Sequence, residues 1–305
     1  MGQIIANLSL IAEKPSRLVA VAEALVVNVI WASTFILIKI GLNDLGPLTL
    51  GGLRYFVGFL LLTPLLTHNT TTAVREWSPR VWFQLILIGV CAYVLGNGAL
   101  FWGLQYIPAT TGSFILSLTP LPVLFLGILW LKEIPTRWQW AGMTVAVLGS
   151  VLFFSPGLSA GDPRAVAVVM VGLSGFALFG ILGRAVARDR QVDTLSLTAI
   201  PLAFGGGMLL VLALLIEGLP GFSIVGLIVV LWLAVVNTAF AYVLYNHSLQ
   251  VMTAFEMNIL MNLAPLITAT LAWFFLSERL EPVQIAGVVT VILGIVLVEW
   301  GRRKN

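Results

Sequence analysis

Residues 104–151 read LQYIPATTGSFILSLTPLPVLFLGILWLKEIPTRWQWAGMTVAVLGSV, and residues 249–296 read LQVMTAFEMNILMNLAPLITATLAWFFLSERLEPVQIAGVVTVILGIV. A shift of 145 positions aligns the two stretches without a gap and makes 15 of their 48 residue pairs identical. The pairs that an apolar composition does not produce by chance are Gln105/Gln250, Pro120/Pro265, Glu133/Glu278, Gln139/Gln284, Gly142/Gly287 and Gly149/Gly294. We therefore expect an internal duplication whose unit holds two apolar helices joined by a short charged turn.

The composition places the chain in a membrane. Of its 305 residues, 59% are hydrophobic and 10% are charged, and the mean hydropathy is +1.04. So little polar surface cannot cover a soluble globule of this size. The apolar runs are continuous over about 20 residues, which is the length a helix needs to cross the bilayer core, whereas barrel strands alternate in polarity. The predicted fold class is an all-α integral membrane protein.

Several partners and cofactors are disfavoured by the sequence. The net charge of +3 is spread over loops and forms no basic face, so nucleic acid is not an expected partner. Cys91 is the only cysteine, which excludes disulfides and cysteine-built metal sites within one chain. No Gly-x-x-x-x-Gly-Lys-Ser/Thr run is present to hold a phosphate. We expect no cofactor, a monomeric protein, and the lipid bilayer and a small-molecule substrate as partners.

Hydropathy predicts ten membrane helices. They lie near residues 18–41, 46–66, 80–103, 108–131, 137–154, 164–187, 194–216, 222–247, 252–276 and 282–300. With this count, twelve basic residues fall on one side of the membrane and two, Arg164 and Arg279, on the other. The positive-inside rule then makes both termini cytoplasmic in a bacterial inner membrane, with the first apolar run as an anchor and not a removable signal.

The duplication divides the ten helices into two halves, residues 1–156 and 157–305. Because each half has five helices, the second half starts on the opposite side of the membrane and is expected to be inverted relative to the first. Inverted repeats are typical of secondary transporters, which bind their substrate near the midplane where the halves meet. The polar links are too short to fold as a separate soluble domain.

Matched polar residues mark the predicted fourth and ninth helices. The first copy carries Ser113, Ser117 and Pro120, and the second carries Asn258, Asn262 and Pro265 at equivalent positions. Each proline removes a backbone hydrogen bond and is a predicted bending point for gating. Small polar residues also join membrane helices to one another, and this alternative remains open for each residue taken singly. The agreement between the copies favours a shared cavity.

The third and eighth helices predict a second face of the same cavity. Asn97, Phe101 and Trp102 in the third helix align with Tyr242, Asn246 and His247 in the eighth. Amide and hydroxyl groups suit the charged ends of a small zwitterion, and aromatic rings suit a flat or apolar side chain. Trp31 in the first helix is a further candidate wall, although a tryptophan near mid-helix also serves as plain packing.

Three titratable groups near this region are candidates for proton coupling: Glu23, Glu256 and His247. Ionisable residues within a span are costly and often functional. Glu256 has an alternative role as a carboxylate at a helix N-terminus. None of the three is paired with a base at helical spacing, so the sequence predicts transport that is not obligatorily proton-coupled and runs down the substrate gradient.

The remaining charges within or beside the spans have structural interpretations. Arg54 lies about two turns inside the second helix, where an arginine needs a partner or water, and Asp44 is a candidate partner. Glu133 and Glu278 lie at interhelical turns, where each is expected to cap the helix that follows it.

These residues resemble the drug/metabolite transporter superfamily in its EamA-type branch, over essentially the whole chain. The matching pattern is Arg54, Trp130-x-x-Glu133, Gln139-x-x-Gly142 and Gly149, then Trp273, Glu278, Gln284-x-x-Gly287 and Gly294. Within this branch the chain looks most like the YddG-type amino-acid exporters. The resemblance implies alternating access between two inverted halves, around a cavity lined by helices 1, 3, 4, 6, 8 and 9.

The sequence thus predicts a secondary transporter that exports neutral or aromatic amino acids across the inner membrane, and not an enzyme. The main alternative is a drug or other metabolite efflux carrier, which for a cationic drug needs Glu23 or Glu256 to face the cavity. A membrane-embedded enzyme is disfavoured because the two histidines, His68 and His247, lie in unrelated places without an adjacent acid. A channel is a weaker possibility.

Overall fold

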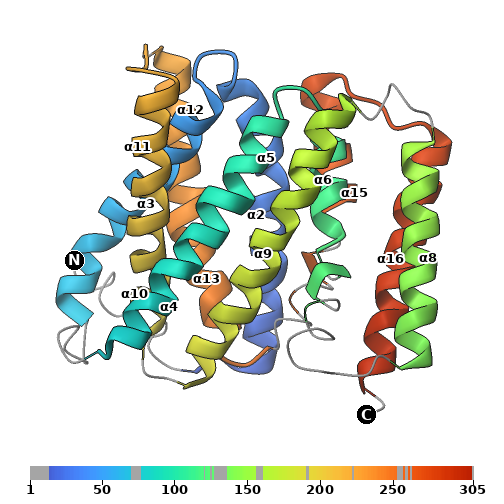
Figure 1. The fold of residues 1–305 in the computed structure, drawn as a ribbon, viewed down its shortest axis with the longest axis horizontal. Coiled ribbons are helices and arrows are strands. Elements are labelled where there is room, and N and C mark those ends of the chain that lie inside the picture. Colours follow the sequence, from blue (N-terminus) through green and yellow to red (C-terminus); the bar gives the residue numbers. More distant parts are fainter. Residues whose placement is uncertain are drawn as a thin grey trace.

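The computed structural model describes residues 14–69, 77–119, 121–123, 126, 136–155, 161–189, 192–221, 223–252, 257, 260–261 and 263–303. These residues form a bundle of long helices, roughly side by side, joined by short turns (Figure 1). No strand occurs among them. The predicted all-α fold class is confirmed for this part of the chain.

The helices follow the order of the predicted spans. The first half contains α2 (Arg17–Gly41), α3 (Pro47–Asn69), α4 (Pro79–Gly89), η2 (Val90–Asn97), α5 (Gly98–Gly103), α6 (Ala109–Ser117) and α8 (Arg137–Phe154). The second contains α9 (Pro163–Asp189), α10 (Thr194–Pro201), η4 (Leu202–Gly206), α11 (Gly207–Ile216), α12 (Ile224–Ala234), η5 (Val235–Phe240), α13 (Ala241–Ser248), α15 (Ala264–Leu276) and α16 (Pro282–Arg303).

Five helical rods are long and apolar enough to cross a membrane. They are Arg17–Gly41, Pro79–Gly103, Pro163–Gly183, Leu195–Ile216 and Ile224–Ser248, and they match the first, third, sixth, seventh and eighth predicted spans. Shorter apolar helices, Trp140–Phe154, Ala264–Leu276 and Pro282–Gly294, lie in the fifth, ninth and tenth. The protein is therefore a multi-pass helical membrane protein.

Side-chain caps begin several of these helices. Ser16 accepts a hydrogen bond from the Val19 backbone N–H at the start of α2, and Ser78 caps α4 just before a proline at the first helical position. Asp193 and Ser223 do the same for α10 and α12. A helix start leaves four backbone N–H groups without partners, and these side chains bind one each. The caps explain why the starts of these four helices agree with the predicted spans to within about two residues.

Two carboxylates cap helices that lie far away in the sequence. Glu217 accepts hydrogen bonds from the Leu48 and Thr49 backbone nitrogens, both at 2.9 Å, at the start of α3. Glu278 accepts from the Ala109 and Thr110 nitrogens at 3.0 and 3.2 Å, at the start of α6. The sequence-based assignment of Glu278 to the following helix is therefore wrong. The start of α6 supplies free N–H donors, whereas Gln284 binds the Glu281 backbone N–H beside the start of α16.

The predicted fourth and ninth spans are interrupted in the structure. Helix α6 ends at Ser117, and Leu118 and Thr119 form a turn immediately before Pro120, which lies outside the described residues. Pro265 lies in the first turn of α15 and not in the middle of a continuous helix. Proline lacks an N–H donor and is best accommodated in the first turn of a helix. The expectation of single helices over 108–131 and 252–276 is thus corrected to helices that break beside these prolines.

The duplication is visible in the backbone. The π-helices η2 and η5 begin at Val90 and Val235, which are 145 positions apart, the same offset that aligns the repeated sequence. A π-helix widens one turn and releases carbonyl groups from the regular ladder, and it is frequent at functional sites. Each wide turn lies in the middle of a long rod.

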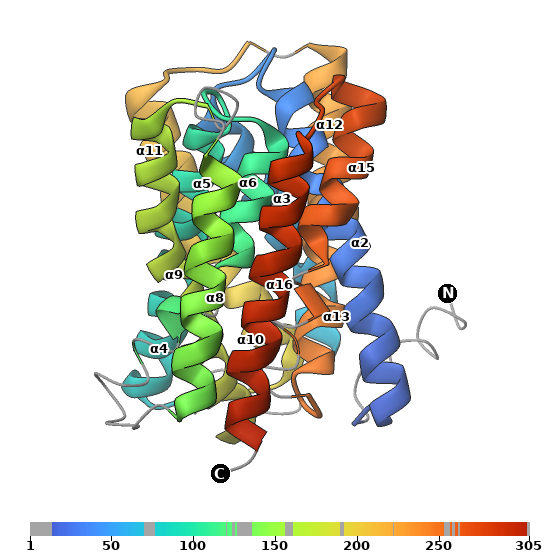
Figure 2. The same ribbon diagram turned by 90° about the vertical axis from the view of Figure 1, so that its right-hand side faces the viewer.

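The helices α8 and α16 form a tightly packed pair on one flank of the bundle (Figures 1 and 2). A Cβ atom on Gly149 would lie 2.7 Å from the Val291 nitrogen and 2.9 Å from the Gly287 oxygen. A Cβ atom on Gly294 would lie 2.6 Å from the Gly142 oxygen. Gly149 lies against the earlier part of α16 and Gly142 against its later part, so the two helices are antiparallel. Only glycine permits this backbone approach.

Candidate functional site

An aromatic cluster fills the centre of the bundle between α2, η2, α9 and α13. The Tyr242 ring centroid lies 5.0 Å from Trp31, 5.7 Å from Tyr93 and 6.3 Å from Phe179, and Trp31 also packs 5.1 Å from Tyr245. Rings at these spacings are in favourable contact. Two residues predicted from separate helices, Trp31 and Tyr242, are thereby brought together.

Amide and hydroxyl groups join this cluster through the wide turn η2. The Tyr242 side chain lies close to the side chains of Asn97 and Tyr93. Asn97 also donates from Nδ2 to the Ala92 carbonyl oxygen at 2.7 Å, a carbonyl within η2. The predicted pairing of Asn97 with Tyr242 on one surface is consistent with these contacts.

Asn237 in η5 connects the two halves of the bundle. Its Nδ2 group donates to the Ile30 carbonyl oxygen at 2.7 Å and to the Thr34 hydroxyl at 2.9 Å, both in α2. Its backbone oxygen accepts a hydrogen bond from the Trp31 indole nitrogen at 3.2 Å. A fully buried residue whose side-chain amide donates to α2 and whose backbone oxygen accepts from α2 fixes how η5 and α2 lie against each other.

Arg54 in α3 points at the same wide turn. Its Nε donates to the Thr238 hydroxyl at 2.8 Å, and its Nη2 donates to the Asn237 carbonyl oxygen at 3.0 Å. Asp44 instead accepts a hydrogen bond from Ser223 at 2.8 Å. The predicted Arg54–Asp44 pair is therefore wrong. Asp44 lies beyond the end of α2, where the Ser223 hydroxyl reaches it, while Arg54 is deep in the bundle.

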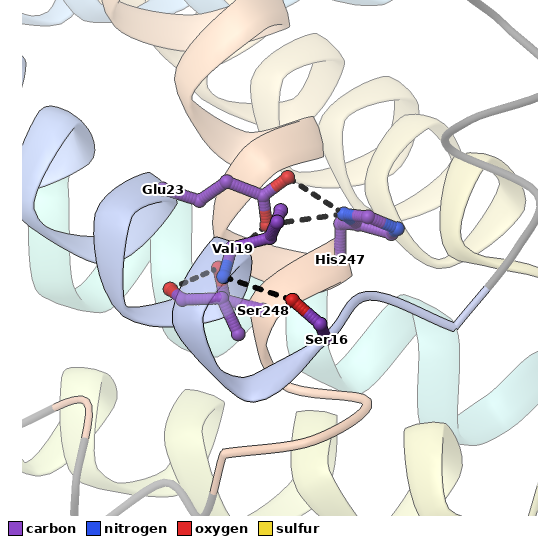
Figure 3. A network of polar contacts seen from close by, with 6 residues as sticks. Ser16, Val19, Glu23, His247 and Ser248 are labelled. Carbon is purple, nitrogen blue, oxygen red and sulfur yellow. Dashed lines mark hydrogen bonds and ion pairs between the residues drawn. The ribbon is translucent and has the colours of Figure 1, made fainter.

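Glu23 and His247 form an acid–base pair between α2 and α13 (Figure 3). The His247 Nδ1 atom lies 2.9 and 3.0 Å from the two Glu23 carboxylate oxygens. The Ser248 hydroxyl donates to Glu23 at 3.0 Å. The sequence-based premise that Glu23 and His247 are unpaired is wrong, because a search at helical spacing cannot find partners from helices 224 residues apart.

Several buried polar atoms in the bundle have no protein partner. In the described part of the chain these include Asn28 Oδ1, Tyr55 Oη, Thr111 Oγ1, Ser113 Oγ and Asn237 Oδ1. They come from α2, α3, α6 and η5. Two of these residues contact the aromatic cluster, because Tyr55 packs 4.5 Å from Tyr93 and the Asn237 backbone oxygen accepts a hydrogen bond from Trp31. Buried polar groups are nearly always hydrogen-bonded, so a group of such exceptions points to water or a ligand.

Other predicted site residues have ordinary structural contacts. Phe101 is fully buried and packs 6.1 Å from Tyr55, and Trp102 packs 5.2 Å from Tyr106. Asn246 donates to the Thr198 hydroxyl at 2.7 Å. In addition, Ser117 donates to the Phe114 carbonyl oxygen at 2.6 Å, within its own helix. Their part in substrate binding stays a prediction.

The second polar stripe is not among the described residues. Asn258, Asn262, Glu256 and Pro120 all lie outside them. Of the two predicted gating prolines, Pro265 is buried at the start of α15. These assignments also stay predictions.

Sequence reasoning missed the roles of Asn237, Thr238, Tyr93 and Tyr245. It compared positions between the two copies, and Asn237 and Thr238 align with Ala92 and Tyr93, so they form no matched polar pair. The available signal was an asparagine and a threonine in the middle of an apolar run, where polar groups are costly.

A multi-pass helical bundle whose interior holds polar side chains and wide helical turns has the architecture of a membrane transport protein. Residues 18–155 and 164–300 each match the EamA-like transporter family. The two matches cover most of the chain, and the protein belongs to this family as a membrane transporter.

Similar proteins cover nearly the same length. An "Uncharacterized transporter" from Archaeoglobus fulgidus is 28% identical over 281 residues, covering 88% of this chain and 93% of that protein. The "Uncharacterized inner membrane transporter YedA" from Escherichia coli K12 is 24% identical, covering 90% and 88%. A solved crystal structure aligns with a TM-score of 0.68 at 14% identity, covering 95% of this chain and all of that one. This last likeness concerns the fold alone.

Proposed function

We propose that the protein is a secondary transporter that exports neutral or aromatic amino acids across the inner membrane by alternating access. The observation that carries the proposal is that Tyr55 and Asn237, two residues in contact with the aromatic cluster around Trp31 and Tyr242, have buried oxygens, Tyr55 Oη and Asn237 Oδ1, that are unpartnered in the described structure. Unbonded hydroxyl and amide groups suit the charged ends of a zwitterion, and the rings suit a flat side chain. The inner-membrane name of the YedA relative supports this location.

Two inverted five-helix halves, residues 1–156 and 157–305, are part of the proposal. The antiparallel packing of α8 against α16 supports it, because Gly149 meets Gly287 while Gly294 meets Gly142. In the repeat alignment Gly149 corresponds to Gly294, and Gly142 to Gly287. A reciprocal contact of this kind is what a two-fold axis across the helices produces. The same proposal has ten spans and both termini in the cytoplasm.

The test is uptake of labelled amino acids by proteoliposomes that contain the purified protein. We expect phenylalanine, tryptophan and leucine to exchange against the same unlabelled amino acid inside, and lysine and glutamate to exchange far more slowly. Empty liposomes are the control for leakage. If none of the amino acids exchanges faster than in empty liposomes, the proposed substrate class is wrong.

A drug or other metabolite efflux carrier is the second candidate. Glu23 favours it, because a carboxylate within the bundle could attract a cationic drug. This carboxylate is already bound to His247 and Ser248, however, and Arg54 adds a positive charge to the core. A cation is therefore the less suitable substrate. Export of ethidium that is faster than amino-acid exchange in the same proteoliposomes would favour the efflux carrier.

A further inference from the structure

Arg54 is a buried cation with unused hydrogen-bond donors. Only 2% of its surface is exposed. A guanidinium has five N–H donors, and two hydrogen bonds from Arg54, to Thr238 and to the Asn237 carbonyl oxygen, are present among the described residues. The remaining N–H groups can bind a further acceptor.

The partners of Arg54 do not balance its charge. Besides the hydroxyl and the carbonyl oxygen, its Cζ atom lies 4.9 Å from the Tyr55 ring centroid and 5.8 Å from the Phe101 ring centroid. Within the described part of the chain, no carboxylate forms an ion pair with Arg54. Taking a charge out of water is costly unless an opposite charge or good hydrogen bonds compensate it. The surroundings of Arg54 therefore favour the binding of an anion.

Tyr55, whose ring packs beside the guanidinium, has a polar group without a partner among the described residues. The Tyr55 hydroxyl is fully buried and makes no hydrogen bond within the described structure. The Tyr55 ring packs 4.5 Å from Tyr93, which in turn packs 5.7 Å from Tyr242. A chain of contacts thus runs from the Arg54 cation through Tyr55 and the rings of Tyr93 and Tyr242 to Trp31.

We propose that Arg54 binds the carboxylate of the transported substrate, with the Tyr55 hydroxyl as a second donor and the side chain of the substrate against Tyr93 and Tyr242. Planar guanidinium groups bind carboxylates through two parallel hydrogen bonds, and these are stronger than bonds between neutral groups. The substrate class is then a carboxylate with a flat or apolar side chain. This proposal rests on the proposed transport function and names the subsite that binds the carboxylate of the substrate.

The anion site is tested separately from the identity of the substrate. Thermal unfolding of the detergent-solubilised protein is measured with benzoate and with benzamide, which share a ring and differ in charge. We expect benzoate to raise the Tm of the wild-type protein more than benzamide does, Arg54→Gln to lose this preference, and Arg54→Lys to keep part of it. The control Thr238→Val, which removes one Arg54 bond without removing the cation, should keep the preference.

Transport then tests whether the anion site is the substrate site. Phenylalanine, phenylalaninamide and phenethylamine are compared as competitors for labelled phenylalanine in proteoliposomes. We expect the two compounds without a carboxylate to compete at least tenfold more weakly, a difference that corresponds to about 1.4 kcal/mol. Arg54→Gln should compress the three affinities toward one value.

Each outcome decides between the two proposals. Equal effects of benzoate and benzamide on the wild type, or an unchanged benzoate preference in folded Arg54→Gln, overturn the anion site. A clear benzoate preference without any amino-acid exchange keeps the anion site and rejects amino acids as the substrate. Amino-acid exchange in which the amide and the amine compete as well as phenylalanine keeps the transport function and rejects Arg54 as its carboxylate subsite.

Discussion

At the scale of one residue, a substitution of Ser113 distinguishes a role in substrate binding from a role in helix packing. Its side-chain hydroxyl is buried and unpartnered in the described structure, so removing it leaves no broken hydrogen bond behind. We expect Ser113→Ala to keep or slightly raise the Tm, because an unsatisfied buried hydroxyl is unfavourable. The free energy of unfolding should rise by at most about 1 kcal/mol. Transport should slow if the hydroxyl binds substrate.

The measurement is the exchange rate together with the unfolding temperature of the same preparation. Ser150→Ala is the matched control, because Ser150 in α8 donates to the Ala146 carbonyl oxygen of its own helix. Ser113→Ala exchange at the wild-type rate would support the packing role of this residue.

The Glu23–His247 pair carries the second prediction at this scale. The His247 Nδ1 atom lies 2.9 Å from a Glu23 carboxylate oxygen, and chains of carboxylates and histidines within a membrane are typical of proton relays in transporters. We therefore expect an imposed pH gradient to accelerate uptake by the wild type, in place of the sequence-based expectation of transport without proton coupling. Glu23→Gln should abolish this acceleration and keep exchange that needs no gradient.

Uptake is measured in proteoliposomes with and without the pH gradient. Ser16→Ala is the control, since it removes the cap of α2 and leaves the pair intact. Wild-type uptake that does not respond to the gradient, or Glu23→Gln that responds fully, would show that the pair has a structural role only.

At the scale of the residue, matched positions predicted part of the site. The alignment of the two copies pointed to Asn97 and Tyr242, and their side chains lie close together. It could not pair Glu23 with His247 or Arg54 with Thr238, because these residues do not occupy equivalent positions in the two copies. Such pairs depend on how the two halves pack, and a comparison between the copies contains no information on that packing.

At the scale of the element, hydropathy predicted the long helices closely. The predicted span 137–154 agrees with α8, and 194–216 agrees with the rod from α10 to α11. The three π-helices within the described residues were not predicted, because a wide turn leaves the hydropathy of a rod unchanged. The sequence analysis interpreted Pro120 and Pro265 as bends within continuous helices. Proline fits best at the start of a helix, and at Pro265 the structure uses it there.

The glycine contacts between α8 and α16 give a prediction for an element pair. A leucine at Gly149 would force its Cβ into the backbone of α16, 2.7 Å from the Val291 nitrogen. We expect Gly149→Leu to destabilise the protein by about 1–3 kcal/mol through overpacking, or more if the pair separates. Gly180→Leu is the control, because a Cβ atom there would meet nothing within 4 Å.

Thermal unfolding in detergent measures both variants. A Tm for Gly149→Leu that equals that of Gly180→Leu would show that the close contact of α8 and α16 contributes nothing to stability.

At the scale of the whole molecule, Glu217 and Glu278 hold one end of the bundle together. This end carries the loops 42–46, 104–108, 217–223 and 277–281, opposite to the end of α16 at Arg303 (Figure 1). Both carboxylates come from the second half, and both bind the first turns of helices in the first half, α3 and α6. Under the proposed alternating access, we expect these two caps to keep this end closed and to break when it opens.

The last prediction follows from these two caps. Replacing both carboxylates with glutamine weakens hydrogen bonds that only the closed arrangement of this end can make, and a capping side chain contributes about 1 kcal/mol. Two caps together correspond to a shift of more than about tenfold in the equilibrium between closed and open states.

Distances between spin labels at Asn43→Cys and Leu219→Cys, in a Cys91→Ala background, report the opening, since both positions are exposed at this end. We expect the double variant Glu217→Gln/Glu278→Gln to show an additional, longer distance between the two spin labels. Asp162→Asn is the control and should not show it, because the Asp162 side chain accepts a hydrogen bond from the nearby Arg164 backbone N–H. An unchanged distance distribution in the double variant would mean that the two carboxylates stabilise the helices but do not control the opening of this end.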